Sequence, residues 1–168
     1  IAFDGDADRV IMVDHTGEVV DGDQILYLLA LFGNKSNTTE KGVVGTLMSN
    51  LGLEQALLYN DIEFVRAQVG DRYVLAQLLA RQWTLGGESS GHILNLDLTT
   101  TGDGILTALQ ILNIMLNTGS SLNQLLAQMV KQPQVMVNVP VYAGFDFNEH
   151  SNIKEYIATM TADLGSDG

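Results

Sequence analysis

Short apolar runs alternate with longer amphipathic segments along most of the chain, and this alternation constrains the fold more than any other feature. Strand-like runs occupy residues 10–13, 42–47, 62–67 and 93–96, and segments with helical spacing separate the last three. Strands that alternate with helices form parallel or mixed sheets, because each helix carries the chain back across the sheet. The sequence therefore predicts an α/β fold in which a mixed β-sheet has helices on both faces.

Capping residues mark the ends of the expected helices, since short polar side chains accept hydrogen bonds from first-turn N–H groups. The apolar run at 24–32 follows candidate caps at Asp21 and Asp23 and stops at Gly33. Asp71 is expected to cap a helix with one apolar face. That face carries Val74, Leu75, Leu78 and Leu79. Further helices are expected from Ser49 or Asn50 to Leu58, from Asp103 to Leu116, and from Ser120 or Ser121 to a point before Pro133.

Three segments are expected along the chain, at residues 1–33, 34–133 and 134–168. The polar stretch at 34–39 is the best candidate for an internal linker. The last segment opens on an apolar run with strand character. Because the chain starts as if at the end of a buried strand and stops in turn residues, both ends are expected to be boundaries within a longer protein.

The acidic composition excludes some classes of partner. The formal net charge is −12 and only 8 residues are Lys or Arg, so no nucleic-acid-binding surface is expected. No apolar run approaches the roughly 18 residues of a membrane-spanning helix, so no membrane association is expected. The chain contains no Cys, which excludes disulfides and thiolate sites and fits a reducing compartment, with the cytoplasm as the expected location. An anionic substrate therefore needs a metal ion or one of the few cations.

Residues 4–9 read DGDADR and form the most distinctive motif. Asp4, Asp6 and Asp8 alternate directly after an apolar run. Two carboxylates about 4 Å apart repel by roughly 1 kcal/mol in water and about 4 kcal/mol at an effective dielectric constant of 20, and a divalent cation relieves that repulsion. Carboxylate oxygens suit hard cations such as Mg²⁺ or Ca²⁺. The motif predicts a Mg²⁺ site, in which Arg9 holds a phosphate oxygen or pairs with one of the acids.

Three other interpretations of this acidic motif exist. The simplest is a solvated turn between two strands. An EF-hand loop needs Gly at its sixth position and Glu at its twelfth, where this chain has Arg9 and His15, so that interpretation fails. A phosphatase of the haloacid-dehalogenase type also places Asp-x-Asp after an apolar strand, with Asp4 as the nucleophile. That class has Thr or Val where Asp8 stands, but it remains an alternative.

Residues 86–92 read GGESSGH and lie between two strand-like runs. A carboxylate such as Glu88 and a hydroxyl such as Ser90 suit hydrogen bonding to a polyol, and His92 can move protons near neutral pH. A polar loop with a capping Ser is the alternative without function. The same letters fit the Gly-x-Ser-x-Gly nucleophile elbow, but that elbow requires a following helix, and residues 93–98 alternate like a strand.

Arg72 stands in a polar segment, residues 69–72, just before an expected helix. A helix N-terminus with a nearby Arg can hold an anion, which makes Arg72 a candidate substrate-binding residue. A plain N-cap at Asp71 explains the same segment equally well. His15 and His150 are expected to be solvated.

Together, these motifs resemble the α-D-phosphohexomutase superfamily, and within it the phosphoglucosamine mutase family. Residues 4–9 are similar to the metal loop and residues 88–92 to the sugar-binding loop. The resemblance continues in order through DGDQ at 21–24, GTLMSN at 45–50, VGDRY at 69–73 and TTGDGI at 100–105. It implies that segment 1–33 ends the second of four domains, that 34–133 is the third, sugar-binding domain, and that 134–168 begins the fourth.

The resemblance also implies a mechanism. A phosphoserine gives its phosphoryl group to the sugar, the bisphosphate turns over, and the other phosphate returns to the serine. The implied Mg²⁺ ligands are Asp4, Asp6 and Asp8, the implied catalytic residues are Arg9 and His92, and the implied substrate-binding residues are Glu88, Ser90 and Arg72. A whole enzyme of this kind interconverts glucosamine 6-phosphate and glucosamine 1-phosphate, and the chain alone, without the serine, is expected to be inactive.

Two positions depart from the family pattern. Gln68 stands where a Lys is common, which removes a cation beside a phosphate site. Ala7 replaces a usual Gly, a mild change wherever φ is negative. A homodimer of the full-length protein is expected from the resemblance. A related phosphomannomutase or phosphoglucomutase and a non-catalytic sugar-phosphate binding module remain alternatives.

Overall fold

The computed structural model describes residues 1–33 and 42–165. The chain forms two compact units, Ile1–Gln132 and Pro133–Gly168. The expected linker at 34–39 lies outside the described residues, and the three expected domain limits stay a prediction. Among the described helices, none combines the length and apolar character that a membrane crossing requires.

The first sheet is a small antiparallel one in the order β1-β2-β3. It contains β1 (Ala2–Phe3), β2 (Val10–Val13) and β3 (Val19–Val20). Val10 and Met12 on β2 are buried, as their alternation predicts. The expectation of a buried strand at the start of the chain is wrong, because both residues of β1 are exposed and β1 pairs with β2 alone in the described chain.

The second sheet has the order β5-β4-β6-β7. Its strands are β4 (Val43–Thr46), β5 (Phe64–Ala67), β6 (Leu85–Gly87) and β7 (Ile93–Asn95). β4 pairs in parallel with β5 and β6, whereas β7 pairs antiparallel with β6. The predicted mixed sheet is therefore confirmed. The carboxyl ends of β4, β5 and β6 share one edge, and the segments that follow β5 and β6 there carry the candidate residues Arg72, Glu88 and Ser90.

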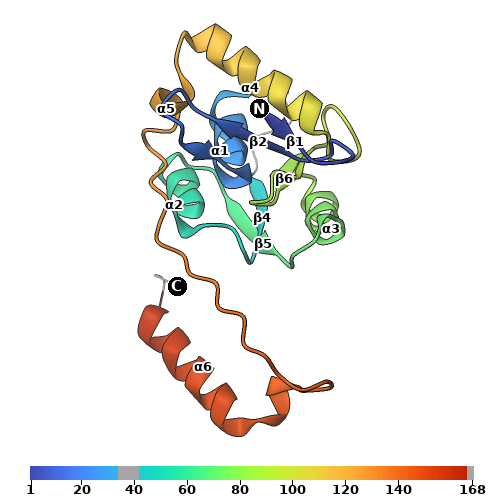
Figure 1. Cartoon of the computed structure of the whole chain (residues 1–168), viewed down its shortest axis with the longest axis vertical. Coiled ribbons are helices and arrows are strands. Elements are labelled where there is room, and N and C mark those ends of the chain that lie inside the picture. Colours follow the sequence, from blue (N-terminus) through green and yellow to red (C-terminus); the bar gives the residue numbers. More distant parts are fainter. Residues whose placement is uncertain (34–41, 166–168) are drawn as a thin grey trace. The chain divides into compact units, whose positions relative to one another are not determined.

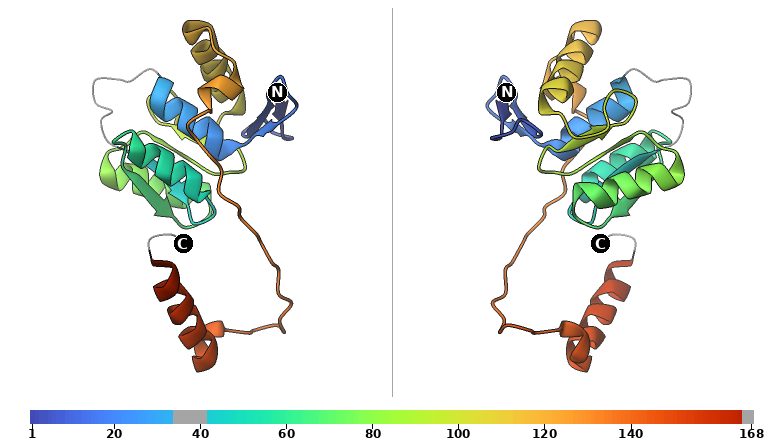
Figure 2. Two further views of the ribbon diagram at one scale, coloured as in Figure 1. Left: turned by 90° about the vertical axis from the view of Figure 1, so that its left-hand side faces the viewer. Right: turned by 90° about the vertical axis from the view of Figure 1, so that its right-hand side faces the viewer.

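Helices cover both faces of this sheet, as predicted (Figures 1 and 2). On one face, α1 (Gly22–Phe32) and α2 (Leu51–Tyr59) pack around Val43, and α4 (Gly104–Thr118) joins the same core. On the other face, α3 (Asp71–Arg81) packs against Val44. Adjacent β4 residues point to opposite faces, which explains why each contacts a different layer.

Most of the expected caps are confirmed, and one is wrong. The side chains of Asp21, Asn50, Asp103 and Ser121 cap α1, α2, α4 and the short α5 (Leu122–Leu125). The N-cap of α3 is instead Gly70, and Asp71 is the first helical residue. The inner face of α3 is also narrower than expected, since Val74 and Leu78 are buried but Leu79 is 64% exposed.

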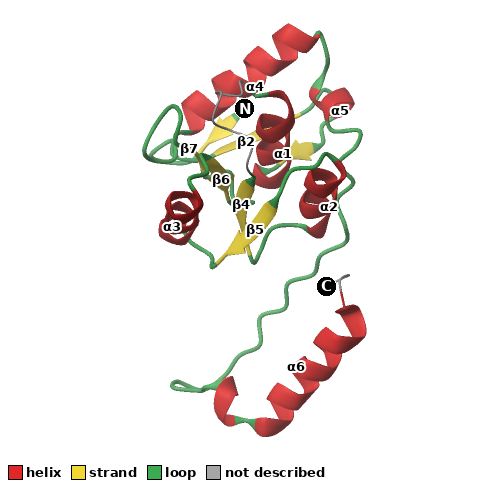
Figure 3. Ribbon diagram, turned by 180° about the vertical axis from the view of Figure 1, so that it is seen from behind, coloured by secondary structure: helices red, strands yellow, loops and turns green. Residues whose placement is uncertain are grey.

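The second unit contains a 3-10 turn, η1 (Phe147–Glu149), and a helix, α6 (Ser151–Leu164). Residues 135–139 run as extended chain without a partner strand in the described structure, so the strand expected there is wrong (Figure 3). No described residue of α6 is buried.

Candidate functional site

The acidic loop, residues 4–9, connects β1 to β2. One carboxylate oxygen each from Asp4, Asp6 and Asp8 lies within 4.8 Å of the other two. The loop closes because the Ala7 N–H donates to the Asp4 carbonyl at 3.3 Å and the Arg9 N–H donates to Asp4 Oδ1 at 3.2 Å. The structure thus brings the three predicted ligands together.

The electrostatics of the acidic loop favour a bound cation. Arg9 Nε lies 3.7 Å from both Asp4 Oδ2 and Asp8 Oδ1, so one guanidinium faces two carboxylates. Loss of solvent raises the pKa of Asp4, but the hydrogen bond from the Arg9 N–H and the nearby Arg9 charge contribute to a larger lowering, so its net pKa lies below the usual value. Asp8 Oδ1 is buried and accepts no hydrogen bond from the described residues. A buried carboxylate oxygen without a donor fits a hard cation.

Ala7 shapes the loop at an energetic cost. Its φ is +59°, in the left-handed region that disfavours side chains. The condition under which Ala7 would be a mild change, a negative φ, is therefore not met. The Gly104 N–H donates to the Ala7 carbonyl at 2.9 Å, and a Cβ at Gly104 would lie 2.6 Å from the Arg9 carbonyl oxygen. The N-terminus of α4 thus fixes the strained residue.

The Gly-rich loop, residues 88–92, connects β6 to β7 and packs directly on the acidic loop. The Val10 N–H donates to the Gly91 carbonyl at 3.1 Å, and Arg9 forms an antiparallel bridge with His92. Gly91 has φ +92°, and a Cβ there would lie 2.1 Å from the Val10 carbonyl oxygen, so only Gly permits this approach. Because β7 and not a helix follows the loop, the nucleophile-elbow interpretation is excluded.

The three predicted substrate-binding residues lie around the same edge of the sheet. Glu88 Oε1 accepts from the Gly70 N–H at 2.9 Å, which ties the Gly-rich loop to the start of α3. Ser90 is exposed at the tip of its loop. Arg72 is exposed in the first turn of α3, where its guanidinium lies 4.5 Å from the Tyr73 ring centroid.

His92 is buried between two carboxylates. Its Nδ1 lies 3.1 Å from Asp8 Oδ2 and its Nε2 lies 4.0 Å from Asp71 Oδ2. The sequence did not indicate that Asp71 lies beside His92, because Asp71 was expected to be the N-cap of a helix. It also missed Gly102, where a Cβ would lie 2.4 Å from the His92 ring. Both stand in polar segments that the sequence already marked, but no local signal pairs them with His92.

These contacts join two chemical capacities. The acidic loop can hold a hard divalent cation and the anion attached to it. The adjacent Gly-rich loop supplies a carboxylate, a hydroxyl and an oriented imidazole, which can bind a polyol and relay a proton. Residues 21–132 match the family model described as "Phosphoglucomutase/phosphomannomutase, alpha/beta/alpha domain III". The chain belongs to this family.

Curated phosphoglucomutase/phosphomannomutase relatives resemble the whole chain. A phosphoglucosamine mutase of Pseudomonas paraeruginosa is 54% identical over 168 residues, which is all of this chain and 38% of the relative. A phosphoglucosamine mutase of Hydrogenovibrio crunogenus is 52% identical over the same span, which is 37% of its length. The chain therefore spans little more than a third of the relatives that it matches.

Solved structures agree with this family fold. A phosphoglucomutase/phosphomannomutase family protein from Burkholderia thailandensis superimposes with a TM-score of 0.68 at 26% identity, covering 77% of this chain and 28% of that one. An N-acetylphosphoglucosamine mutase from Aspergillus fumigatus superimposes with a TM-score of 0.75 at 19% identity, covering 95% of this chain and 43% of that one. Membership of this family decides against the haloacid-dehalogenase-type alternative.

Proposed function

We propose that this chain is part of a phosphoglucosamine mutase, which interconverts glucosamine 6-phosphate and glucosamine 1-phosphate. One observation carries the proposal: three converging carboxylates lie beside the loop that holds Glu88 and His92, and backbone hydrogen bonds join the two loops. The 54% identity to the Pseudomonas paraeruginosa enzyme supports glucosamine phosphates over mannose or glucose phosphates.

Asp4, Asp6 and Asp8 are the residues that would hold Mg²⁺ in this mutase. Bound there, the ion offsets negative charge on a phosphoryl group during transfer. Three carboxylates occupy only part of the roughly octahedral shell of Mg²⁺. We therefore expect weak Mg²⁺ binding by the chain alone. The Aspergillus fumigatus relative, described in complex with GlcNAc-6P and magnesium, supports the choice of metal and substrate class.

The remaining site residues bind and orient the phosphosugar. Arg9, already facing two carboxylates, places a guanidinium beside the transferred phosphoryl group. Asp8 holds the His92 ring, so that His92 can move a proton at the sugar hydroxyl. Glu88, anchored by Gly70, and the exposed Ser90 bind the sugar hydroxyls. Arg72 binds the phosphate that is not being transferred.

Two further expectations accompany this function. The protein is expected to act in the cytoplasm, and the full-length form is expected to be a homodimer. Both stay predictions. If the site only bound sugar phosphates, as a non-catalytic module does, ligand binding would occur without turnover in the full-length protein.

An assay of the full-length protein tests the proposal. We expect turnover of glucosamine 6-phosphate that depends on Mg²⁺ and exceeds turnover of mannose 6-phosphate and glucose 6-phosphate. The isolated 168-residue chain serves as the matched control and is expected to show no turnover. Appreciable mutase activity of the isolated chain, or tight Mg²⁺ binding by it in calorimetry, would contradict this assignment.

A further inference from the structure

The strand order places a second loop at the same edge of the sheet as the Gly-rich loop. From β4 the chain passes through α2 to β5 on one side, and then crosses through α3 to β6 on the other side of β4. The connections leave on opposite faces, so the carboxyl ends of β4 and β6 flank a topological switch point. Ligands of open α/β sheets bind outside such a point. The β4–α2 loop, residues 46–50, therefore lies at the same edge of the sheet as the loop that carries Glu88.

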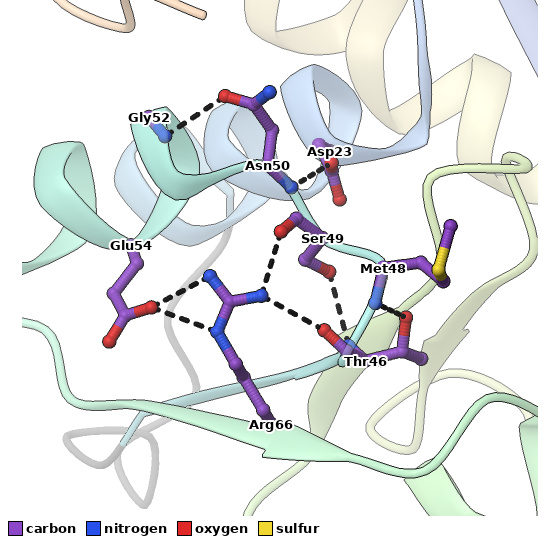
Figure 4. A network of polar contacts seen from close by, with 8 residues as sticks. All are labelled: Asp23, Thr46, Met48, Ser49, Asn50, Gly52, Glu54 and Arg66. Atoms are coloured by element: carbon purple, nitrogen blue, oxygen red, sulfur yellow. Dashed lines mark hydrogen bonds and ion pairs between the residues drawn. The ribbon is translucent and has the colours of Figure 1, made fainter. Parts of the chain in front are cut away.

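The β4–α2 loop has a fixed shape built by its own polar groups (Figure 4). The Ser49 N–H donates to the Thr46 carbonyl at 3.0 Å, and Ser49 Oγ accepts from the Thr46 N–H at 3.1 Å. The Met48 N–H donates to Thr46 Oγ1 at 3.2 Å. Gly45 permits this closure, because a Cβ there would lie 2.6 Å from Ser49 Oγ. The turn is thus closed before any ligand arrives.

Arg66 on β5 clamps this turn from below (Figure 4). Its Nη1 donates to the Ser49 carbonyl at 2.7 Å and to the Thr46 carbonyl at 3.3 Å, so one group bridges both ends of the turn. Its Nε and Nη2 donate to Glu54 Oε2 at 3.0 and 2.8 Å. Because Glu54 stands in the first turn of α2, Arg66 ties the turn to both the sheet and the following helix.

The far end of the turn is fixed by a buried carboxylate. Asp23 on α1 accepts from the Asn50 N–H at 2.8 Å and is only 1% exposed. Arg66 and Asp23 therefore hold the turn from opposite sides. The Arg66 charge is offset by Glu54, which argues against Arg66 as a phosphate ligand and for a structural clamp. Between the two anchors, Leu47 remains 63% exposed at the carboxyl edge of the sheet.

We propose that Arg66 is a positioning residue that holds the β4–α2 loop as the second wall of the sugar site, opposite the Gly-rich loop. Leu47 supplies an apolar surface for the ring of the bound hexose. The inference rests on the proposed mutase function for its ligand. It adds a specificity element outside the motifs that the sequence resemblance marks as metal and sugar loops.

Kinetics of the full-length protein with Arg66→Met test the clamp. Without the Arg66 hydrogen bonds, the β4–α2 loop is expected to shift from its position at the sugar site. The value of kcat/KM for glucosamine 6-phosphate is then expected to fall about tenfold, mainly through KM. Arg66→Lys should recover only part of the loss, because an ammonium cannot bridge two carbonyls and a carboxylate as the planar fork does. Arg81→Met is the matched control, since Arg81 also pairs with a Glu, at 3.7 Å, but lies on α3 away from the turn.

These outcomes distinguish the proposed positioning role of Arg66 from a general effect on stability and from the proposed mutase function. Assays are run below the melting temperature of each variant, and glucosamine 6-phosphate binding is measured independently by calorimetry. Weaker binding for Arg66→Met with no change for Arg81→Met supports the clamp, even if turnover is absent and the mutase function fails. Unchanged binding by Arg66→Met, or equal losses in both variants, overturns it. If Arg66→Met does not fold, Glu54→Gln must show the same rise in KM, and an unchanged KM there overturns the clamp.

Discussion

The acidic loop leaves three like charges facing one another, whereas the charged residues that surround the β4–α2 loop each bond to a group on another element. In the first, three carboxylates converge, two of them face the Arg9 guanidinium, and Asp8 Oδ1 is buried without a hydrogen bond from the described residues. In the second, Arg66 meets Glu54 and two carbonyls, and Asp23 meets a backbone N–H. The first arrangement brings like charges together, which a bound cation would relieve, whereas the second pairs Arg66 with Glu54, although Asp23 Oδ1 is buried without a hydrogen bond from the described residues. Substitutions in the acidic loop should therefore affect function with little effect on stability, whereas substitutions around the β4–α2 loop should lower stability and, at Arg66, also weaken substrate binding.

The largest expected effect comes from Asp8→Asn in the full-length protein. Loss of one ligand, and of the carboxylate that orients His92, should lower kcat/KM by more than about a hundredfold. The free energy of unfolding should stay within about 1 kcal/mol, because removing one of three repelling charges offsets the lost ion pair. Steady-state kinetics and urea unfolding measure both quantities. Glu18→Gln, which removes a charge from the exposed β2–β3 turn, is the control. An Asp8→Asn variant with nearly full activity would contradict the functional role given to the acidic loop.

Asn50→Ala tests the opposite dependence. Asn50 Oδ1 accepts from the Gly52 and Gln132 N–H groups at 2.9 Å, and its Nδ2 donates to the Gln132 carbonyl at 2.8 Å. Removing the cap and these buried bonds should lower the free energy of unfolding by about 2–3 kcal/mol.

Urea unfolding of the chain measures that loss. Asn60→Ala is the control, because the Asn60 side chain makes one hydrogen bond within the described structure, from Nδ2 to the Ala56 carbonyl at the other end of α2. It should cost less than about 1 kcal/mol. Equal losses in the two variants would show that the β4–α2 loop has no special role in stability.

Ala7→Gly should stabilise the chain. A left-handed Ala costs roughly 1–2 kcal/mol, and Gly removes that strain at the expense of greater freedom in the unfolded chain, which leaves a gain of about 0.5–1 kcal/mol. Thermal unfolding measures the shift. Ala76→Gly, on the exposed side of α3, should lose about 1 kcal/mol. A loss of thermal stability in both variants would show that Ala7 is not strained.

The smallest effect concerns pH. Hydrogen bonds from the Thr16 side chain and from the Thr16 and Glu18 N–H groups lower the pKa of Asp14 to about 2, against loss of solvent. Because this pKa is lowered on folding, Asp14 stabilises the folded chain above about pH 4, and that stabilisation is lost as the pH falls through about 2. Burial raises the pKa of Asp23, so its contribution is present below the usual pKa and is lost as the pH rises.

NMR titration of the carboxyl carbons of Asp14 and Asp23 measures both shifts. Thr16→Ala should move the pKa of Asp14 toward its usual value and leave that of Asp23 unchanged. If the pKa values of Asp14 and Asp23 both lay above, or both below, the usual value, the expected contrast between the exposed Asp14 turn and the buried Asp23 would be wrong.

Sequence patterns located the elements well where the signal was local. Asp103 caps α4 because its side chain accepts from the Leu106 N–H only three residues away. The same reasoning failed for Asp71, because Gly70 occupies the cap position and donates its own N–H to Glu88. The long helix expected after Ser121 is the four-residue α5, since the apolar side chains of Leu126 and Met129 pack into the core outside a helix.

By itself, the sequence predicted most of the order of strands and helices, and it located the acidic and Gly-rich loops whose side chains are the candidate metal- and sugar-binding groups. Those features depend on periodicity and on bonds between near neighbours. Only the tertiary structure brought Asp8 to His92 across 84 positions and Asn50 to Asp23 across 27. It also put Ala7 at a positive φ and Arg66 beneath the β4–α2 loop. These contacts depend on the order of strands in the sheet, which no local pattern encodes.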